Sequence, residues 1–489
     1  MLRKIRITLA TVMMIGITWL FLDFTGTAHR LVGGLAKLQF LEAVLALNFI
    51  VIAFLLVLTV ACGRIYCSII CPLGIMQDIF GWVGKKAKKN RYTYSKAISW
   101  LRYGVLAIFI VALVAGVGTI VQLLAPYSAF GRIATNLLQP VYQAGNNVLA
   151  SIAEHYDSYA FYQSEIWLRS VVSFIIAGVT LVTLGVLAWR NGRTYCNTIC
   201  PVGTVLSFFS RFSFLKIHFD VEKCKNCSLC TKNCKASCID YKTHTVDASR
   251  CVVCGDCISV CKHGALKYSM KAGDAGNSAT DPSKRSFLLA STLLATSALA
   301  QQKDKMMDGG LAEIQDKVAP ARQTPLTPPG SLSAQNMALR CTGCQLCISE
   351  CPNQVLRPSD DLMHLMQPVM SYERGYCRPE CNRCSEVCPA GAIKPIRHED
   401  KASTQIGHAV WIKKNCIPLT DGGECGNCAR HCPVGAIEMV PSDPDDDESP
   451  YVPAVNEARC IGCGACENLC PARPFSAIYV EGHEVHKEI

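Results

Sequence analysis

Apolar positions along the chain gather in four long stretches before residue 190. They cover residues 7–22, 41–61, 103–124 and 167–189. Each stretch is close to the ~20 residues that an α-helix needs to cross a bilayer. Because four such stretches are too many to bury in one small soluble core, the pattern predicts an α-helical membrane bundle of four spans in residues 1–216.

Charged positions orient this bundle. Lys and Arg precede the first stretch, fill the segment between the second and third, and follow the fourth. Residues 125–166 carry three acidic side chains and a single arginine, Arg132. Cytoplasmic loops are enriched in Lys and Arg. Both ends of the unit and its middle segment are therefore predicted on the cytoplasmic side of a bacterial cytoplasmic membrane, and residues 125–166 on the outer side.

The composition is unusually rich in cysteine. The 489 residues include 30 cysteines but only 11 histidines. A chain of this length is not a small disulfide scaffold, and so few histidines disfavour Cys/His zinc sites. No haem is predicted, because the four stretches lack histidine and no Cys-x-x-Cys-His occurs. The net charge of +10 fits positive-inside loops, so no nucleic-acid partner is expected.

An internal repeat follows the second and fourth stretches. Residues 63–74 (GRIYCSIICPLG) and 192–203 (GRTYCNTICPVG) agree at eight of twelve positions. Two equivalent segments at one side of the membrane could meet at a single site. Their thiolates could hold a shared [4Fe–4S] cluster or form redox dithiols; alternatively, each proline stops a span and the cysteines are merely small buried residues. These cysteines are Cys67, Cys71, Cys196 and Cys200.

Residues 217–269 contain the spacing Cys-x2-Cys-x2-Cys-x3-Cys twice. This is bacterial ferredoxin spacing, in which the fourth cysteine of each run binds the other cluster. The segment is therefore predicted to be a cytoplasmic α+β ferredoxin-like module with two [4Fe–4S] clusters. The ligand sets are Cys224, Cys227, Cys230 and Cys261, and Cys251, Cys254, Cys257 and Cys234.

A small-residue linker and a signal-like segment occupy residues 270–300. Lys284 and Arg285 precede a modest apolar run that ends in Ala298-Leu299-Ala300. The pattern predicts a twin-arginine-like export signal inside the chain, either cleaved or kept as a fifth span; a short buried helix is the alternative. Such a route would carry a folded cluster domain outward. Residues 301–340 read as a proline-rich tether.

Residues 341–489 carry four further motifs and are predicted to be an exported α+β ferredoxin-type domain with four [4Fe–4S] clusters, which brings the total to six, or seven with the repeat. The first and fourth motifs are regular, and the second and third open with longer spacers. We expect nested pairing, first with fourth and second with third. The predicted ligands are Cys341, Cys344, Cys347 and Cys351; Cys377, Cys381, Cys384 and Cys388; Cys416, Cys425, Cys428 and Cys432; and Cys460, Cys463, Cys466 and Cys470.

These motifs carry a family resemblance. Residues 1–261, with paired Cys-x3-Cys-Pro motifs and two cluster motifs, resemble NapH, a four-span ferredoxin-type quinol dehydrogenase component. Residues 283–470 resemble the exported four-cluster proteins NapG and MauM. Here the two are fused, and the twin arginine is Lys-Arg. The resemblance implies electron flow from membrane quinol to a periplasmic reductase or cytochrome.

We therefore expect a membrane-bound iron–sulfur electron-transfer protein with quinol-dehydrogenase character. No side chain in the apolar stretches stands out as a quinol base, although Glu42 and Arg169 lie near their boundaries. Two alternatives remain. Electrons could come from a cytoplasmic ferredoxin-like donor and reach quinone or the outside, or the chain could be a maturation factor for a periplasmic metalloenzyme.

Overall fold

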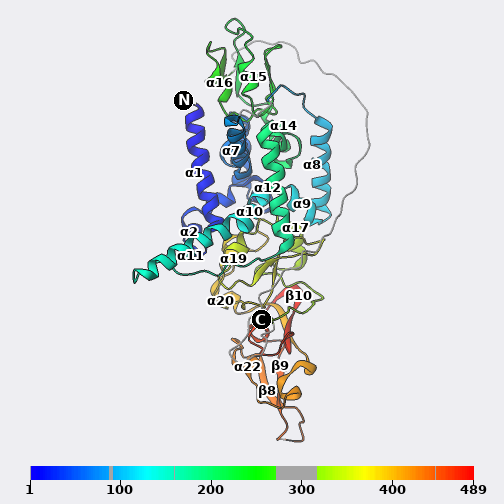
Figure 1. The fold of residues 1–489 in the computed structure, drawn as a ribbon. Coiled ribbons are helices and arrows are strands. Elements are labelled where there is room, and N and C mark those ends of the chain that lie inside the picture. The colour runs from blue at the N-terminus through cyan, green and yellow to red at the C-terminus, as the bar shows by residue number, and fades with distance from the viewer. Residues whose placement is uncertain (1, 88–91, 159, 271–315, 447) are drawn as a thin grey trace.

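A bundle of helices lies between two small ferredoxin-like regions (Figure 1). The structure is a computed structural model that describes residues 2–87, 92–158, 160–270, 316–446 and 448–489. The predicted export signal and most of the linker lie outside the described residues. The residues on either side of that segment lie at opposite ends of the bundle.

The bundle ends with α14, just before the first ferredoxin strand. Its helices are α1 (Leu2–Leu22), α2 (Thr27–Val32), α3 (Gly34–Lys37), α4 (Phe40–Leu45), α5 (Phe49–Cys62), α6 (Tyr66–Ile69), α7 (Pro72–Lys86), α8 (Ser99–Val114), α9 (Gly118–Leu124), α10 (Pro126–Ile133), η1 (Ala134–Leu138), α11 (Gln139–His155), α12 (Val171–Asn191), α13 (Thr194–Thr198) and α14 (Pro201–Ser210).

Two of the four predicted spans are continuous helices. Among the described residues, α1 and α12 are long and apolar enough to cross a membrane by length and composition. The prediction of one continuous helix is wrong for the second and third stretches, which are divided into α4 and α5 and into α8 and α9. Four spans are therefore not confirmed.

Local backbone geometry explains both interruptions. Leu47 has a φ of 55°, and the Asn48 side chain accepts a hydrogen bond from the Val51 N–H, which caps the start of α5. Gly116 has a φ of 73° between α8 and α9. Each interruption approaches the C-terminal region: a Cβ on Gly116 would lie 3.5 Å from Leu339 Cδ2, and one on Gly391 would lie 3.5 Å from Ala46 Cα.

The two copies of the internal repeat fold alike, and the helix that follows each copy packs against the helix that precedes the other copy. Each places a short helix (α6 or α13) before a proline that begins a longer helix (α7 or α14). Proline is well suited to a first helical position, where no amide donor is needed. The helix after the first copy, α7, packs against α12, and the helix after the second copy, α14, packs against α5.

The first ferredoxin-like module lies at the end of the bundle near the N-terminus (Figure 1). Its outer strands pair antiparallel, with Leu215 opposite Met270, and a second small hairpin lies between its two cysteine motifs. The elements are β1 (Leu215–Phe219), α15 (Leu229–Lys232), β2 (Ile239–Asp240), β3 (Thr245–Val246), α16 (Asp256–Val260) and β4 (Leu266–Met270).

The C-terminal region lies at the opposite end (Figure 1). It has three antiparallel pairs: β5 with β6, β8 with β9, and β7 with β10. Its elements are α17 (Ala334–Arg340), α18 (Leu346–Ser349), β5 (Leu356–Pro358), β6 (Pro368–Met370), α19 (Arg383–Val387), α20 (His398–Lys401), β7 (Thr404–Trp411), η2 (Lys413–Asn415), α21 (Ile417–Thr420), α22 (Asn427–Arg430), β8 (Ile437–Pro441), β9 (Tyr451–Val455), α23 (Ala465–Asn468) and β10 (Ile478–Glu488).

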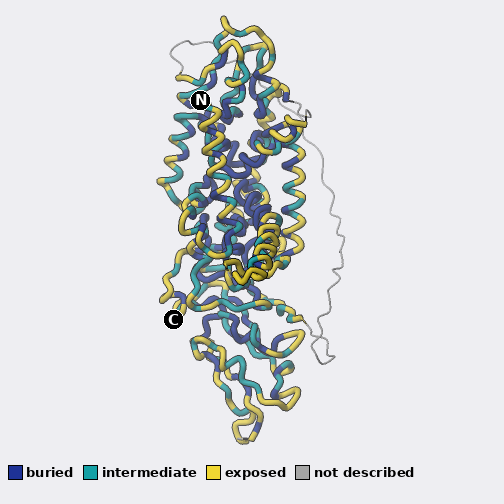
Figure 2. Tube along the Cα trace, turned by 60° about the vertical axis from the view of Figure 1, so that its left-hand side comes forward, coloured by how far each residue is buried: buried dark blue, intermediate teal, exposed yellow. Residues whose placement is uncertain are grey.

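The outer faces of the bundle helices are apolar and exposed, while its centre is buried (Figure 2). Val12 is 61% exposed, Ile50 83%, Val114 78% and Val182 64%. Soluble monomers rarely expose large apolar patches. Together with α1 and α12, this surface indicates association with a membrane.

Candidate metal centres

Four of the six ferredoxin-type motifs share one backbone pattern. The residues two and four places after the first cysteine both have positive φ, which turns successive N–H groups toward one point. Such concavities favour anions and occur at many Fe–S sites. The motifs that begin at Cys377 and Cys416, with longer spacers, lack the pattern. The residues are Asn226, Ser228, Val253, Gly255, Gly343, Gln345, Gly462 and Gly464.

In the first module the thiols gather in crossed fours. One small cavity is lined by all of Cys224, Cys227, Cys230 and Cys261, here called set 1. The thiols that act electrostatically on Cys257 are those of Cys254, Cys251 and Cys234, which together form set 2. Cys238 lies beside set 2, since its sulfur is 3.6 Å from that of Cys234.

The C-terminal thiols also form crossed fours, but between consecutive motifs. The Cys388 thiol lies within electrostatic range of thiols of the first motif, and the Cys351 thiol lies within range of thiols of the second. Likewise, Cys470 acts on the third motif and Cys432 on the fourth. The sets are Cys341, Cys344, Cys347 and Cys388 (set 3); Cys377, Cys381, Cys384 and Cys351 (set 4); Cys460, Cys463, Cys466 and Cys432 (set 5); and Cys416, Cys425, Cys428 and Cys470 (set 6).

The expected nested pairing is therefore wrong. A hairpin explains the observed arrangement: β5 and β6 lie between the first and second motifs, and β8 and β9 lie between the third and fourth. Each antiparallel pair returns the chain to where it started, so the second motif of a pair arrives beside the first. An antiparallel hairpin, β2 with β3, also joins the two motifs of the first module.

The donor groups fit iron–sulfur clusters. Backbone N–H groups donate to the sulfur atoms of the fourth cysteines: Ala265 to Cys261 at 3.3 Å, and Ala436 to Cys432 and Ala477 to Cys470 at 3.2 Å. These bonds stabilise thiolates. Burial raises the pKa of Cys341 to about 12, so binding of iron would have to displace its proton.

A single-ion site does not account for these thiols. In the part of the chain that the structure describes, no group of three or more His, Cys, Asp or Glu side chains is gathered closely enough to hold one metal ion. A [4Fe–4S] cube is larger than one ion and binds one thiolate at each iron.

The four cysteines of the internal repeat form a further group inside the bundle, called the twin site. All are buried, at 4–5% exposure, and the thiols of Cys196, Cys71 and Cys67 all act on Cys200. The Gln77 amide donates to the Cys196 sulfur at 3.3 Å, and the Gly203 N–H donates to the Cys200 sulfur at 3.3 Å.

Two buried arginines join the copies of the repeat reciprocally. Arg64 donates through Nη2 to the carbonyl oxygen of Cys196 at 3.1 Å, and Arg193 donates through Nη1 to that of Cys67 at 2.5 Å. Both side chains are almost fully buried. The arginines fix the two cysteine loops against each other and supply positive charge beside four potential thiolates.

The twin site also contacts the first module. Arg64 Nη1 donates to the carbonyl oxygen of Ser249 at 3.0 Å, and the Asn197 amide donates to that of Ala236 at 3.1 Å. Lys235, which follows Cys234, accepts a backbone hydrogen bond from Arg193 at 2.8 Å. Set 2 and the twin site are therefore neighbours.

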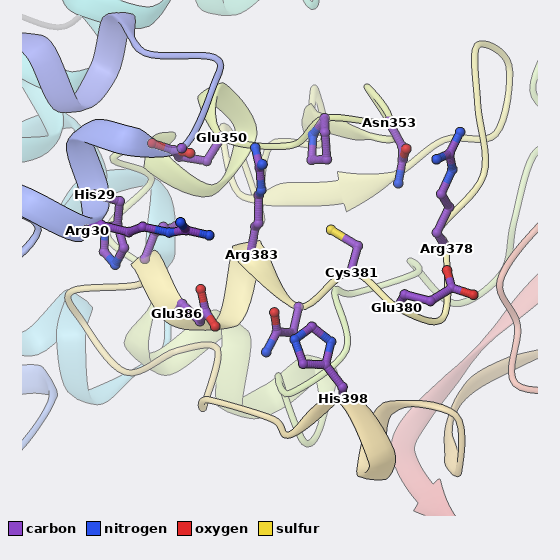
Figure 3. A pocket seen from close by; sticks show the side chains of 14 residues that line it. His29, Arg30, Glu350, Asn353, Arg378, Glu380, Cys381, Arg383, Glu386 and His398 are labelled. Carbon is purple, nitrogen blue, oxygen red and sulfur yellow. The ribbon is translucent and has the colours of Figure 1, made fainter.

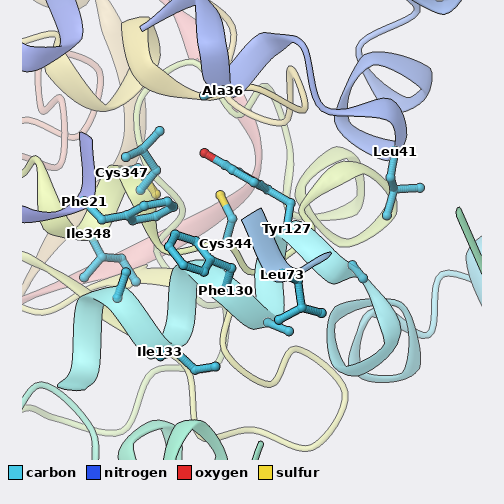
Figure 4. Packing of buried hydrophobic residues seen from close by; sticks show 14 of the residues in the cluster. Phe21, Ala36, Leu41, Leu73, Tyr127, Phe130, Ile133, Cys344, Cys347 and Ile348 are labelled. Atoms are coloured by element: carbon cyan, nitrogen blue, oxygen red, sulfur yellow. The ribbon is translucent and has the colours of Figure 1, made fainter. Parts of the chain in front are cut away.

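At its other end the bundle packs directly on set 3 (Figure 4). Phe21, Tyr127 and Phe130 lie against the loop that carries Cys344 and Cys347. A Cβ on Gly131 would lie 2.2 Å from the carbonyl oxygen of Cys344, so only glycine permits this approach. The Gln345 side chain accepts a hydrogen bond from Asn136 and donates one to Ser173, both at 2.7 Å.

Buried polar side chains lie between the twin site and set 3. The Tyr66 hydroxyl lies within electrostatic range of the Cys71 thiol and the Glu42 carboxyl group, and Glu42 lies within the same range of the Cys344 thiol. On the other side, Arg132 lies near both Tyr195 and Cys344. No role at a metal centre was predicted for these residues or for Arg64 and Arg193; the repeated Gly-Arg and Tyr of the two copies were the available signal.

Sets 3 to 6 continue away from the bundle. Sets 3 and 4 exchange their fourth cysteines, as do sets 5 and 6. Sets 4 and 5 meet where the Cys377 N–H donates to the carbonyl oxygen of Cys463 at 2.9 Å. The Tyr372 hydroxyl donates to the Gly462 carbonyl at 2.5 Å in the same junction. Set 6, which includes α22, lies in the part farthest from the bundle (Figure 1).

A cavity of about 410 Å³ borders set 4, between α2 and α19. Figure 3 shows the Cys381 thiol at this cavity, with His29 and Arg30 reaching it from the bundle and Arg383 from α19. Arg383 also donates to the Thr25 carbonyl oxygen at 3.1 Å. The C-terminal region is thus attached to the bundle by polar contacts as well as by apolar packing.

Comparison with known families finds 4Fe-4S domains in the parts of the chain that carry these cysteines. A family profile described as a 4Fe-4S binding domain matches residues 44–91 and 171–220, the two copies of the repeat with their flanking helices. Two profiles described as 4Fe-4S dicluster domains match residues 423–473 and 247–355.

Several known proteins are similar to about a third of this chain. The methylamine utilization ferredoxin-type protein MauM of Methylobacillus flagellatus is 30% identical over 167 residues, which are 33% of this chain and 70% of that protein. The ferredoxin-type protein NapF of Escherichia coli K12 is 28% identical over 162 residues, 32% of this chain and 87% of NapF. NapG of the same strain is 29% identical over 178 residues, 33% of this chain and 75% of NapG.

The crossed cysteine sets, the 4Fe-4S profiles and these relatives agree on one chemistry, iron–sulfur electron transfer of the ferredoxin type. Each of these three relatives covers about a third of the chain, and the NapH-like half stays a prediction. With more than two thirds of the M. flagellatus protein covered at 30% identity, the chain belongs to the MauM family of ferredoxin-type proteins.

Proposed function

We propose that the chain is a membrane-bound electron-transfer protein that oxidises quinol and delivers electrons to a periplasmic reductase or cytochrome. The observation that carries this proposal is the succession of thiol sets. Sets 1 and 2, the twin site and sets 3 to 6 follow one another from one end of the molecule to the other. In this proposal each set holds a [4Fe–4S] cluster, seven in all, which supply the one-electron chemistry.

The protein's own side chains hold and separate these carriers. The arginines of the repeat lock the twin site inside the bundle, and the packing of Phe21, Tyr127 and Phe130 excludes water from the contact with set 3. Because the twin site lies between sets 2 and 3, it is the step through which electrons cross the bundle.

Replacing Cys67 and Cys200 by alanine tests this role. We expect reduction of the C-terminal clusters by a quinol in membrane vesicles to fall to the rate seen without quinol, because the carrier inside the bundle is lost. Electron paramagnetic resonance should still show the clusters of sets 1 to 6 after chemical reduction. Cys62→Ala is the matched control, since Cys62 belongs to no set and should leave the rate unchanged. Reduction that survives in the double variant would make the repeat purely structural.

Orientation has its own test. In this proposal the bundle lies in the bacterial cytoplasmic membrane with the first module inside and the C-terminal region outside. Alkaline phosphatase, which is active only outside the cytoplasm, should be active when fused after Ile489 and inactive when fused after Met270. Equal activity of both fusions would place the two ferredoxin regions on the same side.

A second entry point for electrons has support at set 1. Cys227 is exposed, and the exposed side chains of Lys223 and Lys225 lie in the same loop. A basic surface beside an exposed carrier suits an acidic ferredoxin-like donor. Reduction of the C-terminal clusters by reduced ferredoxin, but not by quinol, would favour this direction.

A further inference from the structure

A cavity of about 580 Å³ opens between α1 and α7. The α1 side chains that line it recur at helical spacing along one face, and most of its wall is apolar. The wall reaches the exposed outer surface of the bundle, where Ile15 is 63% and Trp82 54% exposed. The apolar lining residues are Ile7, Ala10, Met14, Ile15, Ile75, Ile79, Trp82 and Val260.

The inner end of this cavity is charged. Asp78 accepts hydrogen bonds from Arg6 at 2.6 Å and Arg193 at 2.8 Å, and its carboxylate lies 3.0 Å from Lys235 Nζ. The Lys235 ammonium also lies 3.2 Å from Asp256. Although burial opposes ionisation, Arg193 and Lys235 hold the pKa of Asp78 well below its usual range. The end therefore offers a permanent carboxylate acceptor and cationic donors side by side.

This charged end lies between two thiol sets. The Arg193 side chain that binds Asp78 through Nε also donates through Nη1 to the carbonyl oxygen of Cys67 in the twin site. Lys235 and Asp256 are sequence neighbours of Cys234 and Cys257 in set 2. A molecule seated at Asp78 would be separated from either set by about one layer of side chains.

We propose that this cavity is the quinol site, with the ring at Asp78, Arg6 and Lys235 and the isoprenoid tail between α1 and α7. The inference rests on the proposed quinol oxidation and states where in the bundle the quinol binds. Asp78 accepts a hydrogen bond from a quinol hydroxyl, and Arg6 or Lys235 donates to the carbonyl of the quinone. The reaction would convert quinol to quinone: the two electrons would pass to clusters held by set 2 and the twin site, and the two protons would pass to solvent at the charged end, where Arg3 and Lys85 are exposed.

The mixture of charges favours a quinol over a phospholipid. Arg3, Arg6 and Lys235 are paired with the carboxylates of Asp78 and Asp256, and Lys85 donates to the Asn233 side chain. A phosphate seated here would meet two negative charges. A quinol ring, which donates in one state and accepts in the other, matches both kinds of group.

Binding of a fluorescent quinol analogue, 2-heptyl-4-hydroxyquinoline N-oxide, to the detergent-purified full chain tests the site. Thr11 lines the cavity, and Thr11→Trp fills it. Its neighbour Val12 is 61% exposed and does not line it, so Val12→Trp is the matched control. We expect at least about tenfold weaker binding for Thr11→Trp and unchanged binding for Val12→Trp. Arg6→Gln, which leaves the tail channel open, should also weaken binding.

Iron content and circular dichroism must match the unaltered protein in each variant. Unchanged binding in Thr11→Trp and Arg6→Gln overturns the site, and so does displacement of the analogue by phosphatidylglycerol as readily as by menaquinone. The proposed function fails separately: if quinol does not reduce the unaltered protein, electrons enter elsewhere. If quinol reduces the unaltered protein and Thr11→Trp equally well, only the location is wrong.

Discussion

Replacing Arg193 by methionine will lower the free energy of unfolding of the bundle by about 3–5 kcal/mol, because it leaves part of a buried charge network without its partner. The Arg193 side chain is fully buried, with Nε 2.8 Å from Asp78. The same guanidinium donates to the carbonyl oxygen of Cys67. Methionine fills the volume but supplies no donor, so both acceptors lose a hydrogen bond inside the protein.

The measurement is thermal unfolding of the detergent-purified protein. Arg190→Met is the matched control, because Arg190 lies three residues earlier, in the last turn of α12, and is exposed. We expect the control to change stability by less than about 0.5 kcal/mol. Arg64→Met should behave like Arg193→Met, since Arg64 makes the equivalent contact with Cys196. Equal unfolding midpoints for Arg193→Met and Arg190→Met would contradict a structural role for the reciprocal arginines.

Iron content will distinguish sequential from nested pairing in the C-terminal region. Cys341 and Cys388 belong to one set, so replacing both by alanine should remove a single cluster, about four iron atoms per chain. Cys341 and Cys470 belong to different sets, so that pair should cost about eight. Nested pairing predicts the opposite result, because Cys470 would then serve the first motif.

Single alanine variants at each of the three positions provide the reference, and each should lose about four iron atoms. The comparison depends only on whether the losses overlap. It therefore stays informative even if a neighbouring cluster becomes more labile in every variant.

The cysteine motifs were readable from sequence because their geometry is local. Three thiols at short spacing, with left-handed residues between them, form one side of a cluster site wherever the motif lies. The partner of each motif is a tertiary property. The regularity of the first and fourth motifs suggested that they pair, but the hairpins β5–β6 and β8–β9 bring consecutive motifs together. The turn at Gly435, with a φ of 59°, leads directly from Cys432 into β8 and was a local signal of such a hairpin.

The apolar stretches show what hydropathy cannot predict. Hydropathy reports that a segment is apolar but not whether it runs straight, so the interruptions at Leu47 and Gly116 were not foreseen. Asn48, which caps α5, was a local signal of a helix start inside the second stretch. The buried charges at Asp78 and Arg193 could not be placed from sequence, since 115 residues separate them.

The position of the two ferredoxin regions at opposite ends of the bundle has an electrical consequence (Figure 1). An electron that passes from set 2 through the twin site to set 3 carries its charge through the thickness of the bundle. In a membrane that is negative inside, outward transfer gains about 2.3 kcal/mol per electron for each 100 mV. In the proposed orientation, the potential would add to the driving force for reduction outside, and every turnover would discharge part of it.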